Sequence, residues 1–245
     1  MLTQEEIKKK LGKYAADLVP ANTIIGMGTG STVFWLIQEL AIRIQKGLSI
    51  KIVPTSIQTK NLAKEAGIST VELNDVDSLP VTIDGADEID GYFQMIKGGG
   101  GALLQEKMVA AASMKLIIIA DESKYVSQLG NFPLPVEVVP SGWKQVNKNI
   151  LAKGCNKVIM RQLNDQPFIT DNGHYILDCY FGKIEDATAL NTALHLIPGV
   201  VETGLFINMA NTIIIGYADG RVETSPPTPL HRVERGVTSS RPFPE

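Results

Sequence analysis

Three short segments of the chain contain the residue types that bind anions, move protons and stabilise charge. The first is the loop Gly26–Thr32, which reads Gly-Met-Gly-Thr-Gly-Ser-Thr and lies between an apolar run and a helix-like stretch. Glycines let a backbone approach a ligand closely, and the amides at a helix N-terminus bind anions. Ser31 and Thr32 add hydroxyl donors. The loop therefore favours a small phosphate ligand, with a plain tight turn as the alternative.

The same loop departs from both common nucleotide-binding motifs. Ser31 stands where a dinucleotide fingerprint has its third glycine, and the next strand ends near Pro54-Thr55-Ser56 without an acidic residue to hold a ribose. No Gly-Lys-Ser/Thr triplet of a Walker loop occurs anywhere in the chain. A nicotinamide-dependent dehydrogenase is therefore disfavoured, and we expect no redox cofactor.

The second segment is an acidic cluster, Asp84–Asp90, directly after the apolar residues Val81–Ile83. Carboxyl ends of parallel strands border the ligand crevice, so Asp84 and Asp87 should face the same space as the glycine loop. The cluster could hold a divalent cation, contact a substrate, or be a solvated turn. Its spacing fits no calcium loop, and no histidine lies nearby in sequence. Substrate contact is the favoured reading, and we expect no metal.

The third segment is Lys97 with the four glycines Gly98–Gly101, followed by a helix-like stretch that contains Glu106. Ordering glycine costs roughly 0.5–1 kcal/mol more than ordering alanine, which close passage of the backbone around a ligand would explain. Lys97 could stabilise a developing oxyanion. An isolated helical glutamate is usually a surface residue, but the position of Glu106 behind the glycines favours a catalytic role.

A lysine, Lys124, follows the predicted strand Lys115–Ala120 and is a further candidate for contact with an anion. The three histidines, His174, His195 and His231, read as structural or surface residues, and no nucleophile has a base beside it. Hydrolase chemistry of the Ser–His type is therefore disfavoured. A phosphate anchor, a lysine and several carboxylates suit proton transfer next to a carbonyl, as in aldose–ketose isomerisation.

Alternating strand-like and helix-like stretches predict the α/β scaffold that positions these residues. The pattern favours a Rossmann-like parallel sheet with helices on both faces. The expected strands are Thr23–Met27, Ile50–Val53, Thr70–Leu73, Val81–Ile83 and Lys115–Ala120, and the expected helices are Thr3–Leu18, the stretch after Ser31 to about Gln45, Ile57–Ala66 and Ala102–Ser113.

The pattern changes near Asn131 and predicts a smaller α+β domain. The three prolines of Phe132–Pro140 indicate an extended crossing segment rather than a helix. Further expected elements are strands at Lys157–Arg161, Phe168–Thr170 and Tyr175–Asp178, a hairpin turn at Asp171-Asn172-Gly173, a helix at Ala187–Leu196, and a strand at Thr212–Ala218 that returns to the first sheet. We expect residues 1–130 plus 206–223 to form the Rossmann-like catalytic domain and residues 131–205 the small domain.

The last 22 residues, 224–245, hold five of the thirteen prolines and little apolar material, so we expect a disordered tail. The whole chain has 245 residues, a net charge of −3 and 44% hydrophobic residues. That balance disfavours a nucleic-acid binder acting through bulk positive charge. No apolar run suits a membrane span or a secretory signal, and two distant cysteines indicate a reducing compartment, so we expect a cytoplasmic protein without membrane or nucleic-acid partners.

Several of these motifs together resemble the type A ribose-5-phosphate isomerase family, in order and spacing, from about Thr3 to Val222. They are Gly28-Thr29-Gly30-Ser31-Thr32, Thr82-Ile83-Asp84-Gly85-Ala86-Asp87-Glu88, Lys97-Gly98-Gly99-Gly100 with Glu106-Lys107, Phe132-Pro133-Leu134-Pro135-Val136-Glu137, Thr170-Asp171-Asn172-Gly173 and Ile197-Pro198-Gly199-Val200. One departure is Gly101, where many relatives have alanine, a change expected to be harmless. A non-catalytic phosphosugar sensor, the main rival, would need neither Glu106 nor Lys97.

The resemblance implies an enzyme of the pentose phosphate pathway that interconverts ribose 5-phosphate and ribulose 5-phosphate. It implies that Glu106 is the proton acceptor, with Asp84, Asp87 and Lys97 as further catalytic candidates and no cofactor. It also implies a phosphosugar partner and a homodimer, or alternatively a tetramer. The implied substrate-binding residues are Lys8, Thr29, Gly30, Ser31, Thr32, Asp84, Gly85, Ala86, Asp87, Lys97, Gly98, Gly99, Gly100 and Lys124.

Overall fold

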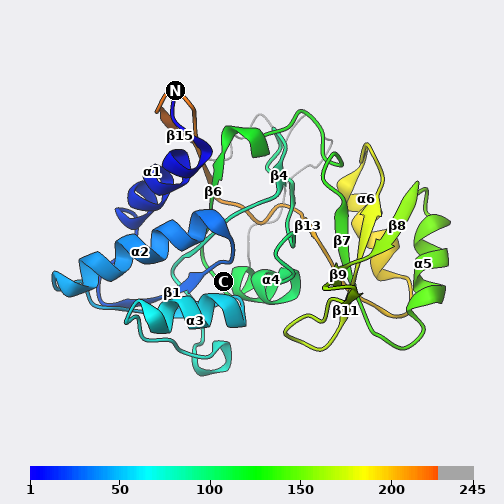
Figure 1. Cartoon of the computed structure of the whole chain (residues 1–245), viewed down its shortest axis with the longest axis horizontal. Coiled ribbons are helices and arrows are strands. Elements are labelled where there is room, and N and C mark those ends of the chain that lie inside the picture. Colours follow the sequence, from blue (N-terminus) through cyan, green and yellow to red (C-terminus); the bar gives the residue numbers. More distant parts are fainter. Residues whose placement is uncertain (226–245) are drawn as a thin grey trace, which may run out of the picture.

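A six-stranded sheet forms the centre of the larger part of the molecule in the computed structural model, which describes residues 1–225 (Figure 1). Its strand order is β15-β14-β6-β3-β1-β2, and every neighbouring pair is parallel except β14 and β15. The strands are β1 (Thr23–Met27), β2 (Ile50–Pro54), β3 (Thr82–Asp84), β6 (Leu116–Asp121), β14 (Thr212–Gly216) and β15 (Val222–Ser225). The expected return of the chain near Thr212 to the first sheet is confirmed by β14.

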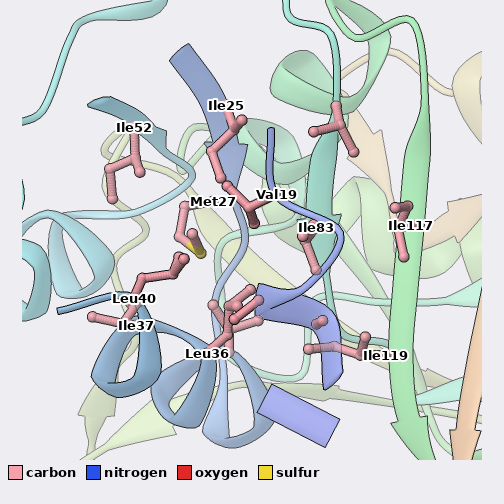
Figure 2. Close-up of a cluster of buried hydrophobic side chains, with 14 of the residues drawn as sticks. Val19, Ile25, Met27, Leu36, Ile37, Leu40, Ile52, Ile83, Ile117 and Ile119 are labelled. Atoms are coloured by element: carbon pink, nitrogen blue, oxygen red, sulfur yellow. The ribbon is translucent and has the colours of Figure 1, made fainter. Parts of the chain in front are cut away.

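Helices cover both faces of this sheet, as the alternating pattern predicts. On one face α1 (Gln4–Ala16) and α2 (Ser31–Gln45) pack over the apolar side chains shown in Figure 2, and α3 (Ile57–Glu65) lies beside β2 and contributes to the same core. On the other face lie α4 (Leu103–Ala111) and a three-stranded sheet of β4 (Glu88–Ile89), β5 (Met95–Ile96) and β13 (Leu205–Phe206). Strand β6 is buried on both faces, because its side chains alternate between the two cores.

A smaller α+β domain is built on an antiparallel sheet with strand order β12-β7-β11-β8. Its strands are β7 (Leu134–Val138), β8 (Lys157–Met160), β11 (Tyr175–Tyr180) and β12 (Val200–Thr203). Helices α5 (Trp143–Leu151) and α6 (Ala187–His195) pack on this sheet through a second apolar core (Figure 1). Helix α4 lies between the six-stranded sheet and the sheet of the small domain (Figure 1).

The sequence predictions for this domain hold in part. The proline-rich segment Phe132–Pro140 is extended rather than helical, as predicted, but it contains β7, a central buried strand, and is not simply a crossing segment. Pro135 is tolerated because pairing with β12 starts only at Val136. Phe168–Thr170 is not a strand. The short hairpin is instead β9 (Gln162–Leu163) with β10 (Gln166–Pro167), whose turn residues Asn164 and Asp165 both have positive φ.

The Asp171-Asn172-Gly173 turn does form, with the Gly173 amide donating to the Thr170 carbonyl, but the neighbours of β11 in its sheet are β7 and β8. Thr70–Leu73 is also not a strand. Only Thr70 bridges to β2, and the chain then enters a 3-10 turn, η1 (Leu73–Asp75), because Asn and Asp favour turns.

The sequence predicts that a disordered tail starts at residue 224. That start is too early, because Thr224 and Ser225 lie in β15 and pair with β14. The rest of that segment, residues 226–245, lies outside the described residues. Within residues 1–225, no helix is long and apolar enough to cross a bilayer.

Candidate active site

The predicted site residues meet at one cavity of about 150 Å³, at the carboxyl ends of β1, β3 and β6. Such ends meet at one edge of a parallel sheet, which is why segments far apart in sequence come together. The lining residues are Gln4, Lys8, Thr29, Gly30, Ser31, Thr32, Gly85, Ala86, Asp87, Lys97, Gly98, Gly99, Gly100, Glu106, Ala120, Asp121 and Lys124. Of the predicted site residues, Asp84 alone is absent from this lining, since it is fully buried behind it.

The loop between β1 and α2 brings backbone amides to this cavity. Gly30, the residue before α2, has φ +119°, a conformation that favours glycine, and it leaves the first amides of the helix open toward the cavity. Gly28 has no room for a side chain, because a Cβ there would lie 1.9 Å from Oδ1 of Asp84. The loop can therefore bind an anion at a helix N-terminus.

A cluster of hydroxyl groups fixes this loop from below. The Thr29 hydroxyl hydrogen-bonds with the hydroxyls of Thr55 and Ser56, both at 2.8 Å, and with that of Thr59 at 3.1 Å. The Thr29 amide donates to Oδ1 of Asp84 at 3.1 Å. Thr29 therefore holds the loop in place with its side chain, and Ser31 is the exposed hydroxyl at the helix start.

At the floor of the cavity, Lys97 joins two buried carboxyl groups. Its Nζ lies 2.9 Å from Oδ2 of Asp84 and 3.3 Å from Oε1 of Glu106, and it donates to the Gly85 carbonyl at 2.5 Å. The exposed fractions of the Lys97, Asp84 and Glu106 side chains are 2%, 0% and 6%. Buried charges need such pairing, because water no longer stabilises them.

Burial sets the direction of the pKa shifts of the two carboxyl groups, Glu106 and Asp84. It raises the pKa of Glu106 to about 8, although the Lys97 cation opposes the rise. Burial also raises the pKa of Asp84. Burial alone would lower the pKa of Lys97. The nearby carboxylates of Asp84 and Glu106 have the larger combined effect and raise the pKa of Lys97. A carboxyl group with such a pKa can take up or release a proton near neutral pH, beside a lysine that stays charged.

Glu106 reaches the cavity from the first turn of α4, directly after the glycine run. Its buried Oε2 has no hydrogen-bond partner among the described residues. A buried carboxyl oxygen without a partner is costly, and a polar group entering the cavity would relieve that cost. The arrangement suits a proton acceptor that meets its partner only when a ligand is bound.

The ionisation of Glu106 makes a prediction about stability. Between its ordinary pKa of 4.5 and its folded pKa of about 8, Glu106 is protonated in the folded protein and ionised in the unfolded chain. The folded state then binds more protons, so the free energy of unfolding falls as pH rises. Glu106→Gln removes this titration, and its stability advantage should grow by about 1.4 kcal/mol per pH unit over this range.

Urea unfolding of both proteins across this pH range measures that advantage. Glu65→Gln, at an exposed glutamate of α3, is the matched control and should show no such trend. An advantage for Glu106→Gln that stays constant or shrinks with rising pH would show that Glu106 ionises normally.

Asp87 and the glycine run form the wall next to Glu106. Oδ2 of Asp87 accepts the Gly99 amide at 2.7 Å, and a Cβ at Gly99 would lie 2.5 Å from Oδ1 of the same aspartate. Gly101, the departure from the family pattern, has φ +85°, and a Cβ there would meet the Phe168 ring at 2.5 Å. Glycine therefore suits that position.

Two lysines bring positive charge to the cavity from separate elements, Lys8 from α1 and Lys124 from the 3-10 turn η2 (Glu122–Lys124). Within residues 1–225 neither of them forms a salt bridge with an acidic residue. They are placed to meet an anionic ligand.

Three lining residues, Gln4, Ala120 and Asp121, were not among the predicted site residues. The Gln4 amide donates to Oδ2 of Asp121 at 3.3 Å. The position of Asp121 at the carboxyl end of β6 was an available signal, by the same rule that located Asp84. Gln4 had none, because only tertiary packing brings the start of α1 to this edge.

In the part of the chain that the structure describes, no three His, Cys, Asp or Glu side chains form a group that could hold a metal ion. The acidic segment after β3 explains why. Asp84 is directed to Lys97, Asp87 to the Gly99 amide, and Glu88 to the amides of Gly130 and Phe132.

Comparison with known proteins identifies the family. Residues 51–220 match the family model described as ribose 5-phosphate isomerase A (phosphoriboisomerase A). Ribose-5-phosphate isomerase A of Bacillus mycoides is 54% identical over 215 residues, which cover 87% of this chain and 97% of the relative.

Solved structures of ribose 5-phosphate isomerases have the same fold as this chain. Ribose 5-phosphate isomerase from Plasmodium falciparum superposes with a TM-score of 0.88 at 39% identity, covering 91% of this chain and 98% of that one. A D-ribose-5-phosphate isomerase in complex with phospho-erythronic acid has a TM-score of 0.88 at 37% identity, covering 92% of this chain and all of that one. This chain belongs to the ribose 5-phosphate isomerase A family.

Proposed function

We propose that this protein interconverts D-ribose 5-phosphate and D-ribulose 5-phosphate, a reaction of the non-oxidative pentose phosphate pathway. The observation that carries the proposal is the buried Glu106 beside Lys97, facing a cavity whose other side is the open N-terminus of α2. The reaction needs both features, a group that moves a proton between adjacent carbons and an anchor for phosphate.

In this mechanism Glu106 is the base. Its carboxylate removes the proton from carbon 2 of the open-chain aldose, and the resulting carboxylic acid returns a proton to carbon 1 of the enediolate. The hydroxyl proton of O2 passes to O1 in the same conversion, so that the carbonyl group forms at carbon 2. The pKa of Glu106 near 8 makes the protonated and ionised forms similar in energy, which suits a group that must take and then release a proton. The unpartnered Oε2 is the candidate atom for this transfer.

Lys97 supplies the charge that stabilises the enediolate. Lys97 remains protonated while Glu106 changes its ionisation. The net charge of the Lys97, Asp84 and Glu106 side chains therefore changes only by the proton that Glu106 takes up or releases. Asp84 holds Lys97 and the Thr29 amide in place, and Asp87 orients the glycine run. A preorganised cation in a site shielded from water stabilises an oxyanion far better than one in solution.

The phosphate end of the substrate would bind at the amides of Gly30–Thr32 with Lys8 and Lys124. A family member 37% identical to this chain is known in complex with phospho-erythronic acid, and such a ligand pairs a phosphate with a second anionic group. Incubation of the purified protein with ribose 5-phosphate, followed by NMR detection of ribulose 5-phosphate, tests the function. Absence of product from a folded protein would reject it.

Replacing Lys124 with alanine should chiefly raise KM. The lysine contributes to phosphate binding in the ground state and the transition state alike, so kcat should change little. A charge-assisted contact contributes about 1.5–3 kcal/mol, which corresponds to a KM increase of about 10- to 100-fold. Steady-state kinetics with ribose 5-phosphate measures both constants.

The matched control is Lys115→Ala, at an exposed lysine immediately before β6, whereas Lys124 follows the strand's other end. It should leave both constants unchanged. A Lys124→Ala variant with unchanged KM, or equal turnover of ribose and its phosphate by the wild type, would contradict the anchor.

Three further properties belong to this proposal. Residues 1–130 with 206–223 form the catalytic domain and residues 131–205 the small one, which the separate apolar cores of the two sheets support. The protein acts in the cytoplasm, in keeping with two free buried thiols. It assembles as a homodimer, with a tetramer as the alternative, and light scattering of the purified protein distinguishes the two.

A further inference from the structure

An arginine of the small domain reaches the glycine run from outside the cavity. Arg161 lies between β8 and β9, and its Nη1 donates to the carbonyls of Gly98 at 2.8 Å and Gly99 at 3.1 Å. None of the motifs singled out in the sequence includes it. It is therefore a contact between the small domain and the candidate active site that the mechanism above does not use.

The guanidinium is held firmly in this position. Its Nε and Nη2 donate to the two carboxylate oxygens of Asp178, at 3.0 and 2.5 Å. The Arg161 and Asp178 side chains are 15% and 16% exposed. A bidentate pair with limited exposure fixes the plane of the guanidinium, so its remaining nitrogen has one defined direction.

Because Arg161 binds the carbonyls of Gly98 and Gly99, it also fixes the direction of the amides that follow them, those of Gly99 and Gly100. In a trans peptide the carbonyl of one residue and the amide hydrogen of the next point in opposite directions. With the Gly98 carbonyl directed to Arg161, the Gly99 amide is directed away from it and donates to Asp87. With the Gly99 carbonyl also on Arg161, the Gly100 amide must likewise be directed away from the arginine.

The Gly100 amide has no protein acceptor within residues 1–225, and Gly100 lines the cavity. A carbonyl hydrogen-bonded to a cation also makes the amide of the same peptide group a stronger donor. Without the arginine, nothing else holds the Gly99 carbonyl among the described residues, and glycine permits the peptide to rotate.

We propose that Arg161 is a positioning residue for the isomerisation, which orients and polarises the Gly100 amide as a hydrogen-bond donor to the reacting oxygens of the sugar. This inference rests on the proposed function. Arg161 acts from the small domain, through the glycine backbone, and Asp178 acts through Arg161. The phosphate anchor at α2 is on a different element and does not depend on it.

The test is steady-state kinetics of Arg161→Ala with ribose 5-phosphate. We expect kcat to fall about 100-fold, since a misplacement of about 1 Å at a reacting centre can cost that much, while KM changes little. Guanidinium at millimolar concentration, far below the molar range that unfolds proteins, should restore part of kcat. Guanidinium should not restore the kcat of Arg161→Met, because the methionine side chain fills the space that the added guanidinium would occupy.

Arg221→Ala is the matched control, since Arg221 also pairs with aspartate, at Asp219, but lies between β14 and β15 and makes no hydrogen bond to the glycine run among the described residues. It should keep wild-type kcat with and without guanidinium. If Arg161→Ala is folded by circular dichroism and keeps wild-type kcat, or loses kcat without any rescue, the positioning role is wrong.

If Arg161→Ala does not fold, Arg161→Lys decides the question. A lysine cannot hold Asp178 with two bonds and also bind both carbonyls, so kcat should still be reduced, and wild-type kcat in that variant would overturn the proposal. A wild-type protein that does not isomerise ribose 5-phosphate would instead reject the proposed function itself, which separates the two failures.

Discussion

Glu106→Gln is expected to lower kcat by about 10²–10⁴-fold, the usual contribution of a general base. Glutamine has the shape of glutamate but cannot accept the proton from carbon 2. KM should change little, because the phosphate anchor and Lys97 are untouched. The variant should also be more stable than the wild type at pH 7, since it lacks the buried titration that raises the pKa of Glu106 to about 8. Lower turnover with higher stability excludes misfolding as the cause.

Glu65→Gln, at an exposed position of α3, serves again as the control and should retain wild-type turnover. Near-normal turnover by Glu106→Gln would make Asp84 or Asp87 the leading base candidate. Of these two, Asp87 lines the cavity directly, whereas Asp84 is buried behind Lys97.

Lys97→Met should give the second large effect. It removes the only cation that lies between Asp84 and Glu106 in the described residues, and kcat should fall by about 10²–10³-fold, as for loss of one oxyanion-stabilising group. It also leaves two carboxyl groups buried without a partner charge. Breaking a buried pair costs about 3–5 kcal/mol, so urea unfolding should show a clear loss of stability.

The pH profile of the residual activity of Lys97→Met shows whether kcat falls because the positive charge is lost or because the fold is disturbed. Lys97 opposes the rise in the pKa of Glu106, so its removal should move the acid limb of kcat to higher pH. A variant with lowered kcat but an unmoved profile would show that Lys97 acts only on structure, and unchanged kcat would remove it from the mechanism.

The sequence locates the cavity well where one general rule applies. Asp84, Lys124 and the glycine loop each follow a predicted strand of the parallel sheet, and such ends share one edge. Position in the chain therefore located most of the cavity without any three-dimensional information. The apolar strands β1 and β6 were recognisable because burial on both faces leaves continuous apolar runs.

Features that depend on packing between distant segments were not predictable. The ionisation of Glu106 depends on the balance between burial and Lys97, and a sequence does not show how deep a side chain lies. Burial proved the larger influence. Arg161 gave no signal, because its proposed role depends on carbonyls 62 and 63 residues away in the chain. Pro135 obscured β7, since its compatibility with the sheet depends on where the neighbouring strand begins.

The most direct test of the central claim, that Glu106 carries a proton between carbon 2 and carbon 1, is isomerisation of ribose 5-phosphate in heavy water, followed by NMR. A carboxyl group that exchanges its proton with solvent should place deuterium at carbon 1 of ribulose 5-phosphate. The label should increase over repeated turnovers, and Glu106→Gln should abolish its incorporation. Product formed through many turnovers without any carbon-bound deuterium would indicate direct hydride transfer and would contradict the proposed role of Glu106.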